Sequence, residues 1–154
     1  MFFVSVFFML AGYTEVSAAT LTQTPVDNWY YTRRGGGKPY MSAQWNLYDL
    51  DGKTAYCIEP GVNITTSDYE GAIGWINSPY SDEVNRKIQL YGYYGYNYPG
   101  HENLRYRAAA QSLIWEATGG QIIEFWTERY GNGNFINLNA ERNEILRLAS
   151  THYE

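Results

Sequence analysis

Residues 104–120 read LRYRAAAQSLIWEATGG and predict one amphipathic helix. Asn103 can cap its start, and the pair Gly119-Gly120 can end it. One side of this helix carries residues at successive spacings of four, three, four and three, which is typical of a buried stripe. The stripe consists of Leu104, Ala108, Gln111, Trp115 and Thr118. Gln111 is therefore a polar residue at a position that the pattern assigns to the core.

A carboxamide buried at position 111 needs hydrogen-bond partners, because leaving it unpaired costs about 1–3 kcal/mol. One interpretation is a satisfied core glutamine that holds a backbone carbonyl. The other interpretation is that the carboxamide takes part in chemistry, which requires a second reactive group nearby.

The part of the chain before residue 80 predicts strands. In residues 40–48, YMSAQWNLY, apolar and polar side chains alternate with a period of two. The pair Asp51-Gly52 is typical of a hairpin turn, after which residues 53–58 return as a second strand. An earlier candidate strand, residues 29–34, ends at three successive glycines.

Helical patterns dominate after residue 80. Ser81 can cap a helix whose first turn carries two carboxylates, and residues 138–149 predict another helix capped by Asn137 or Asn139. Residues 131–134, GNGN, predict a turn. We therefore expect an α+β fold, in which an antiparallel β-sandwich or barrel-like part is joined to a small α-helical subdomain.

Length and composition place the chain among single globular domains. It has 154 residues, of which 45 % are hydrophobic, and this is enough material for a core. The formal charge of −5 argues against a nucleic-acid partner. The sixteen tyrosines favour either a recognition surface or a β-rich core with tyrosines at its rim.

The first 19 residues, MFFVSVFFMLAGYTEVSAA, resemble an export signal. Residues 1–11 form an apolar run of suitable length, and small residues at 16–19 provide a cleavage site, although no basic segment precedes the run. The run is too short to span a membrane as a helix, so we expect no membrane insertion of the mature domain, residues 20–154. The alternative is a buried N-terminal strand.

Cys57, in TAYCIEPG at residues 54–61, is the only cysteine. Exported proteins tend to pair their cysteines, so a single one is unusual. It is either a small buried hydrophobe or the second reactive group that Gln111 requires. A thiol and a carboxamide held in contact can condense to an internal thioester with loss of ammonia, since proximity supplies effective molarities of about 10⁵–10⁸ M.

These segments resemble the thioester domain of Gram-positive surface adhesins and pili. The family's cysteine lies in an aromatic-Cys-apolar segment, as in Tyr56-Cys57-Ile58, and its glutamine lies in a helix of the type Thr-Gln-x-x-apolar-Trp, as in residues 110–115. Residues 87–99, with their Tyr-Gly-Tyr turn, also resemble the family. One position departs from the pattern, because Ala110 stands where the family usually has threonine.

The resemblance implies a covalent attachment module that uses no cofactor and acts once, without turnover. An amine of the target, most plausibly a lysine, would attack the Gln111 acyl carbon, and Cys57 would leave. The resemblance further implies secretion and display on the cell wall or a pilus of a Gram-positive bacterium, and a host surface or matrix protein as partner. The residues expected to line the thioester are Tyr56, Ile58, Ala110 and Trp115.

Two other classes of function remain open. A cysteine hydrolase or transglutaminase needs a histidine base near the thiol, and the candidates are His101, in a turn expected to be solvated, and His152. A non-covalent binding domain would use exposed tyrosine and tryptophan side chains instead. The sequence offers no ligand spacing typical of a metal site.

Overall fold

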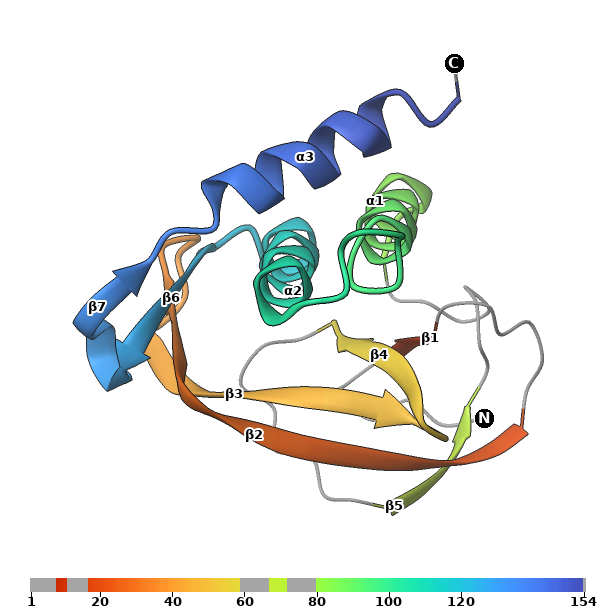
Figure 1. Ribbon diagram of the computed structural model, residues 1–154, viewed down its shortest axis with the longest axis horizontal. Helices are drawn as coiled ribbons and strands as arrows, with labels where there is room; N and C mark the ends of the chain where they lie inside the picture. The colour runs from red at the N-terminus through yellow and green to blue at the C-terminus, as the bar shows by residue number, and fades with distance from the viewer. Residues whose placement is uncertain (1–7, 11–16, 59–66, 72–79, 154) are drawn as a thin grey trace.

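The computed structural model describes residues 8–10, 17–58, 67–71 and 80–153. Within them an antiparallel sheet carries three helices on one side (Figure 1), which confirms the predicted α+β fold with a small helical part. The elements are β1 (Phe8–Leu10), β2 (Ser17–Arg34), β3 (Met41–Leu50), β4 (Lys53–Cys57), β5 (Ser67–Gly71), α1 (Asp82–Tyr93), α2 (Leu104–Gly119), β6 (Ile122–Glu128), β7 (Asn132–Ile136) and α3 (Asn139–Ser150).

The described strands form one sheet in the order β1-β4-β3-β2-β6-β7, and β5 pairs with β2 beside this path. Strand β2 is long enough to pair with β3, β5 and β6. Its register against β3 shifts between Pro25 and Tyr30, around Asn28, whose backbone is left-handed with φ of 65°. The predicted strand at residues 29–34 is thus the second half of a longer one.

The predicted start of α1 and both predicted ends of α2 are confirmed. The Ser81 side chain accepts a hydrogen bond from the Val84 N–H at 3.3 Å, and the Asn103 side chain accepts one from the Tyr106 N–H at 3.0 Å. Gly120 ends α2 in the left-handed conformation that favours glycine. The predicted cap of the third helix is wrong, because Leu138 precedes α3 without a side-chain capping bond, although the Asn137 side chain accepts from the Asn139 N–H at 2.9 Å.

Helix α2 lies at the centre of the molecule. It packs against β4 and β6 and against both other helices, and Figure 1 shows α3 on the far side of α2 from the sheet. All nine residues from Arg107 to Trp115 are buried. The predicted stripe is therefore only partly right: Leu104 is exposed and Thr118 is half-buried, whereas the middle of the helix is buried around its whole circumference.

Residues 131–134 contribute less turn than predicted. Gly131 closes a short 3₁₀ turn, and Asn132 already begins β7, which pairs with β6. At the N-terminus, β1 pairs with β4 and Ser17 begins β2. The division into an export segment, residues 1–19, and a mature domain, residues 20–154, stays a prediction.

Candidate functional site

Cys57 and Gln111 meet where the end of β4 lies against the middle of α2. Both are 2 % exposed. The Cys57 backbone N–H donates to Gln111 Oε1 at 3.0 Å, and Gln111 Nε2 donates to the Cys57 carbonyl at 2.6 Å. Because only the oxygen can accept and only the NH₂ can donate, these two bonds fix which way the carboxamide faces.

The carboxamide occupies a rung that the sheet leaves open. Pairing of β3 with β4 ends at Tyr48 and Ala55. In an antiparallel pair, alternate residues turn their N–H and C=O groups toward the same neighbouring strand. After Ala55, the next β4 residue whose N–H and C=O face the β3 side is therefore Cys57. Gln111 fills this rung from α2 with one donor and one acceptor, and the β4 backbone stays satisfied where β3 no longer reaches it.

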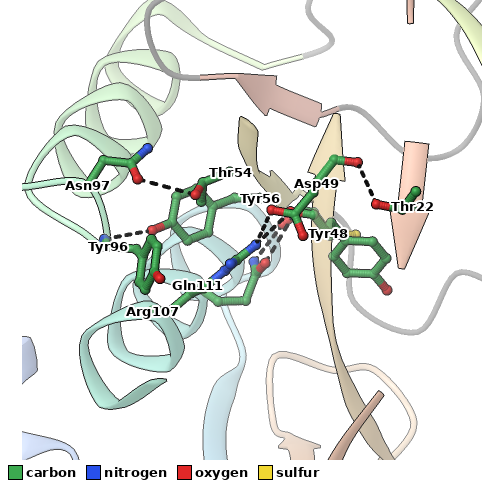
Figure 2. A network of polar contacts seen from close by, with 10 residues as sticks. Thr22, Tyr48, Asp49, Thr54, Tyr56, Tyr96, Asn97, Arg107 and Gln111 are labelled. Carbon is green, nitrogen blue, oxygen red and sulfur yellow. Dashed lines mark hydrogen bonds and ion pairs between the residues drawn. The ribbon is translucent and has the colours of Figure 1, made fainter. Parts of the chain in front are cut away.

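Two further polar side chains attach the same face of α2 to the sheet. One turn before Gln111, the Arg107 guanidinium donates to the Tyr48 carbonyl at 2.6 Å and to Asp49 Oδ1 at 3.2 Å (Figure 2). Two turns after Gln111, the Thr118 hydroxyl donates to the Ile58 carbonyl at 2.7 Å. Helix α2 is thus hydrogen-bonded to β3, to the end of β4 and to the residue that follows it.

On the other face of β4, Tyr56 anchors the turn after α1. Its hydroxyl accepts a hydrogen bond from the Tyr96 N–H at 3.0 Å. Burial raises the pKa of Tyr56 to about 12, and the hydrogen bond from Tyr96 opposes the shift, so the phenol is neutral at physiological pH. Ala110, which is completely buried, faces the same turn at Gly95.

A family comparison agrees with this geometry. The sequence model described as thioester domain matches residues 54–148, a stretch that begins in β4 and ends in α3. The chain belongs to the thioester domain family. No curated protein and no solved structure matches it. Thioester domains are thioester-containing adhesion modules of extracellular surface proteins, and the matched stretch contains both Cys57 and Gln111.

In this thioester domain, Tyr48 lies on the same side of the sheet as Cys57. It pairs with Ala55, so Cys57 is its diagonal neighbour on the adjacent strand. Burial raises the pKa of the Tyr48 phenol, and the neighbouring groups of Cys57 and Tyr31 add to the shift. The Tyr48 side chain is therefore neutral and lies on the thiol's side of the sheet.

The prediction that His101 lies in a solvated turn is wrong. His101 is buried, its ring stacks on Tyr106 at a centroid distance of 3.6 Å, and its Nδ1 bonds the Tyr94 carbonyl at 2.7 Å. His152 Nδ1 bonds the Tyr94 hydroxyl at 2.6 Å. Both histidines thus pack around the end of α1, and the contacts described for them are with tyrosines.

All four residues expected to line the thioester are buried, and their contact with the thioester stays a prediction. Ile58 and Ala110 are completely buried, and Tyr56 and Trp115 are 2 % exposed. Sequence reasoning missed Arg107 and Thr118, although their places four residues before and seven after Gln111 on a helix could have indicated them.

In the described ranges, no three His, Cys, Asp or Glu side chains are placed to hold a metal ion. Nor does any helix in them combine the length and the apolar character that crossing a membrane requires.

Proposed function

We propose that Cys57 and Gln111 form an internal thioester, and that this thioester attaches the protein covalently to an amine on its target. The observation that carries the proposal is the pair of reciprocal hydrogen bonds between the Gln111 carboxamide and the Cys57 backbone, in a site that is 2 % exposed. The Cys57 Sγ is only two bonds from the Cys57 Cα, whose N–H and C=O neighbours hold the Gln111 carboxamide. Such a fixed, buried approach supplies the proximity that the condensation needs.

Formation of the thioester uses groups that are already in place. The Cys57 sulfur attacks Gln111 Cδ, negative charge develops on Oε1, and the Cys57 N–H already donates to that oxygen at 3.0 Å. A donor at the oxygen that gains charge is the arrangement that accelerates acyl transfer. Nε2 then leaves as ammonia, taking up the thiol proton.

The crosslink forms in a second acyl transfer. A neutral amine of the target bonds to Gln111 Cδ, the C–S bond breaks, and its electron pair stays with the sulfur. The proton that the amine nitrogen loses ends on Cys57, so the products are an amide and a thiol. The thiol leaves more readily than an amine would, because its pKa is about 8.5 against about 10.4 for a lysine ammonium.

A groove beside Arg107 offers the target an approach. Its volume is about 680 Å³, and it opens between the β3–β4 hairpin, the turn after α1 and the start of α2. Its lining is polar and includes Arg107, one helical turn before Gln111, so the groove is the side from which we expect a target lysine to approach. The residues that line it are Thr22, Asp49, Gly52, Lys53, Thr54, Tyr96, Asn97 and Arg107.

The proposed partner is a host surface or extracellular-matrix protein, and the proposed setting is the cell wall or a pilus of a Gram-positive bacterium, after removal of residues 1–19. These proposals rest on the membership of the thioester domain family, whose members are extracellular adhesion modules. The completely buried Ile58 and Ala110, together with Tyr56 and Trp115, would exclude water from the bond until the target arrives.

Intact mass spectrometry tests the thioester directly. The purified protein is expected to be one ammonia lighter than its sequence, and methylamine should add its own mass at Gln111. Cys57→Ala and Gln111→Ala should both have the unmodified mass and resist methylamine. Gln121→Ala is the matched control, because Gln121 is also buried and also donates to a backbone carbonyl, that of Gly35 at 3.0 Å.

An unmodified mass for the native chain would refute the thioester. Gln111 would then be a structural glutamine that completes the β3–β4 ladder, and adhesion would have to be non-covalent.

A further inference from the structure

Trp115 carries a buried hydrogen-bond donor that is unpaired among the residues that the structure describes. Its side chain is 2 % exposed, and its indole Nε1 has no hydrogen-bond partner in the described part of the chain. Buried donors are nearly always paired in folded proteins, so a lone one calls for a structural or catalytic explanation.

Helix spacing places Trp115 one turn after Gln111, on the face of α2 that is bonded to the end of β4. Gln111, one turn before Trp115, bonds the Cys57 backbone. Thr118, one turn after Trp115, bonds the Ile58 carbonyl. Trp115 lies between these two attachment points along the helix. Side chains on a helix lean toward its N-terminus, so the indole covers the turn that carries Gln111.

Packing holds the indole in this position. Its ring contacts the Tyr31 ring at a centroid distance of 4.7 Å. The indole is thus confined between β2 on one side and the turn of Gln111 on the other.

We infer that the Trp115 indole N–H is a second donor to the Gln111 oxygen during acyl transfer. The inference rests on the proposed thioester. When the amine lone pair bonds to Gln111 Cδ, the π pair of the carbonyl moves to the oxygen, which becomes an anion with room for more than one donor. The Cys57 N–H supplies the first and Trp115 the second. The anion then reforms the carbonyl, the C–S bond breaks, and the proton from the amine ends on the Cys57 sulfur.

This role accounts for the lone donor in the unreacted protein. An interaction accelerates a reaction only when it is stronger in the transition state than before it. The planar carboxamide oxygen of Gln111 is already served by the Cys57 N–H. A donor that gains its partner only as charge develops stabilises the transition state without stabilising the starting amide.

The test compares Trp115→Phe with Trp45→Phe. Both residues are buried tryptophans, but the ring contacts described for Trp45 are with Trp29 and Phe125, and Trp45 is not on α2. Intact mass measures the loaded fraction, and the loaded protein is then treated with methylamine. Trp115→Phe is expected to react about 10²–10³-fold more slowly, which is the usual loss for one oxyanion donor. Trp45→Phe should react at the native rate.

A spectroscopic readout separates donation from packing. Because the indole donates only as charge develops, the infrared thioester band of loaded Trp115→Phe should keep its native wavenumber while the reaction slows, whereas a carbonyl displaced by poor packing would shift the band. Benzothienylalanine at position 115 replaces the N–H with sulfur and keeps the ring shape, so it should reproduce the slow rate even if the phenylalanine variant folds poorly.

Two results overturn the inference in different ways. If the loaded variants at position 115 react within about twofold of the native protein, Trp115 only packs and the thioester proposal stands. If the native chain itself has an unmodified mass, the thioester falls and the inference falls with it.

Discussion

Gly95 is the position at which a single methyl group should disturb the reactive pair most. A Cβ at Gly95 would lie 2.5 Å from the Tyr56 hydroxyl, 2.8 Å from the Ala110 Cβ and 3.1 Å from the Tyr91 carbonyl. Real Cβ atoms do not approach other heavy atoms within 3.0 Å. Since Gly95 has no left-handed backbone, Gly95→Ala brings no backbone strain, and its effect comes from this contact alone.

The cost of Gly95→Ala can be worked from the two contacts. Overpacking a close-packed site costs about 1–3 kcal/mol. If Tyr56 moves to relieve it, the hydrogen bond from the Tyr96 N–H is weakened, which adds about 0.5–1.5 kcal/mol. We therefore expect the free energy of unfolding to fall by about 2–4 kcal/mol.

The loaded fraction should fall as well. Tyr56 immediately precedes Cys57, and Ala110 immediately precedes Gln111. The added methyl pushes these two neighbours apart, and a small misplacement of reacting groups costs far more in rate than in stability.

Urea denaturation and intact mass measure both effects in one preparation. Gly119→Ala is the control, because a Cβ there would meet no atom closer than 3.8 Å and would favour the end of α2 by about 0.5–1 kcal/mol. The reasoning is refuted if Gly95→Ala unfolds at the native urea concentration and is fully loaded.

Three other substitutions probe the site. Ala110→Thr should lower the free energy of unfolding by about 1–3 kcal/mol and should not raise the loaded fraction, because the Cβ of Ala110 already faces Gly95 closely; denaturation with intact mass checks this. Tyr56→Phe should reduce the loss of stability above pH 10. Folding raises the pKa of Tyr56 to about 12, so its contribution to the free energy of unfolding is complete below the unfolded-state pKa and is lost as the pH rises toward the folded-state value. Urea midpoints from pH 8 to 12 test this. Gln111→Glu should lower the free energy of unfolding by at least about 1–3 kcal/mol at pH 7, because a carboxylate cannot donate to the Cys57 carbonyl. Stability should return at low pH, where the carboxyl is protonated, and the urea midpoint measured against falling pH tests this sign.

The sequence was sufficient for the elements that depend on local chemistry. Ser81, Asn103 and Gly120 bound their helices as predicted, because caps and left-handed glycines act within a few residues. The end of β4 at Cys57 was also predictable from a hairpin turn and a following proline. The meeting of Cys57 with Gln111 was expected from reactivity and family resemblance, and the structure brings them together.

The rest depends on contacts between distant segments. Residues 131–134 looked like a simple turn because glycine usually interrupts strands, yet their glycines sit at an irregular edge where β6 shifts register against β7. His101 looked solvated because its neighbours are turn residues, but Tyr106 from α2 covers its ring. The helix spacing places Arg107 on the face of Gln111, but it does not show that this side chain reaches a carbonyl 59 positions away.

The geometry at Cys57 also bears on why an amine, rather than water, would be the productive partner. Aminolysis leaves a neutral amide at position 111, whose oxygen can again accept from the Cys57 N–H. Hydrolysis would leave a carboxylate, which has no proton for the Cys57 carbonyl and would place a charge where both side chains are 2 % exposed. Burying an unpaired charge is far more costly than burying a satisfied amide. The buried site at the end of β4 therefore favours the crosslinked product over the hydrolysed one. To the extent that the transition state for hydrolysis already resembles the charged product, hydrolysis is slower than attack by the target amine.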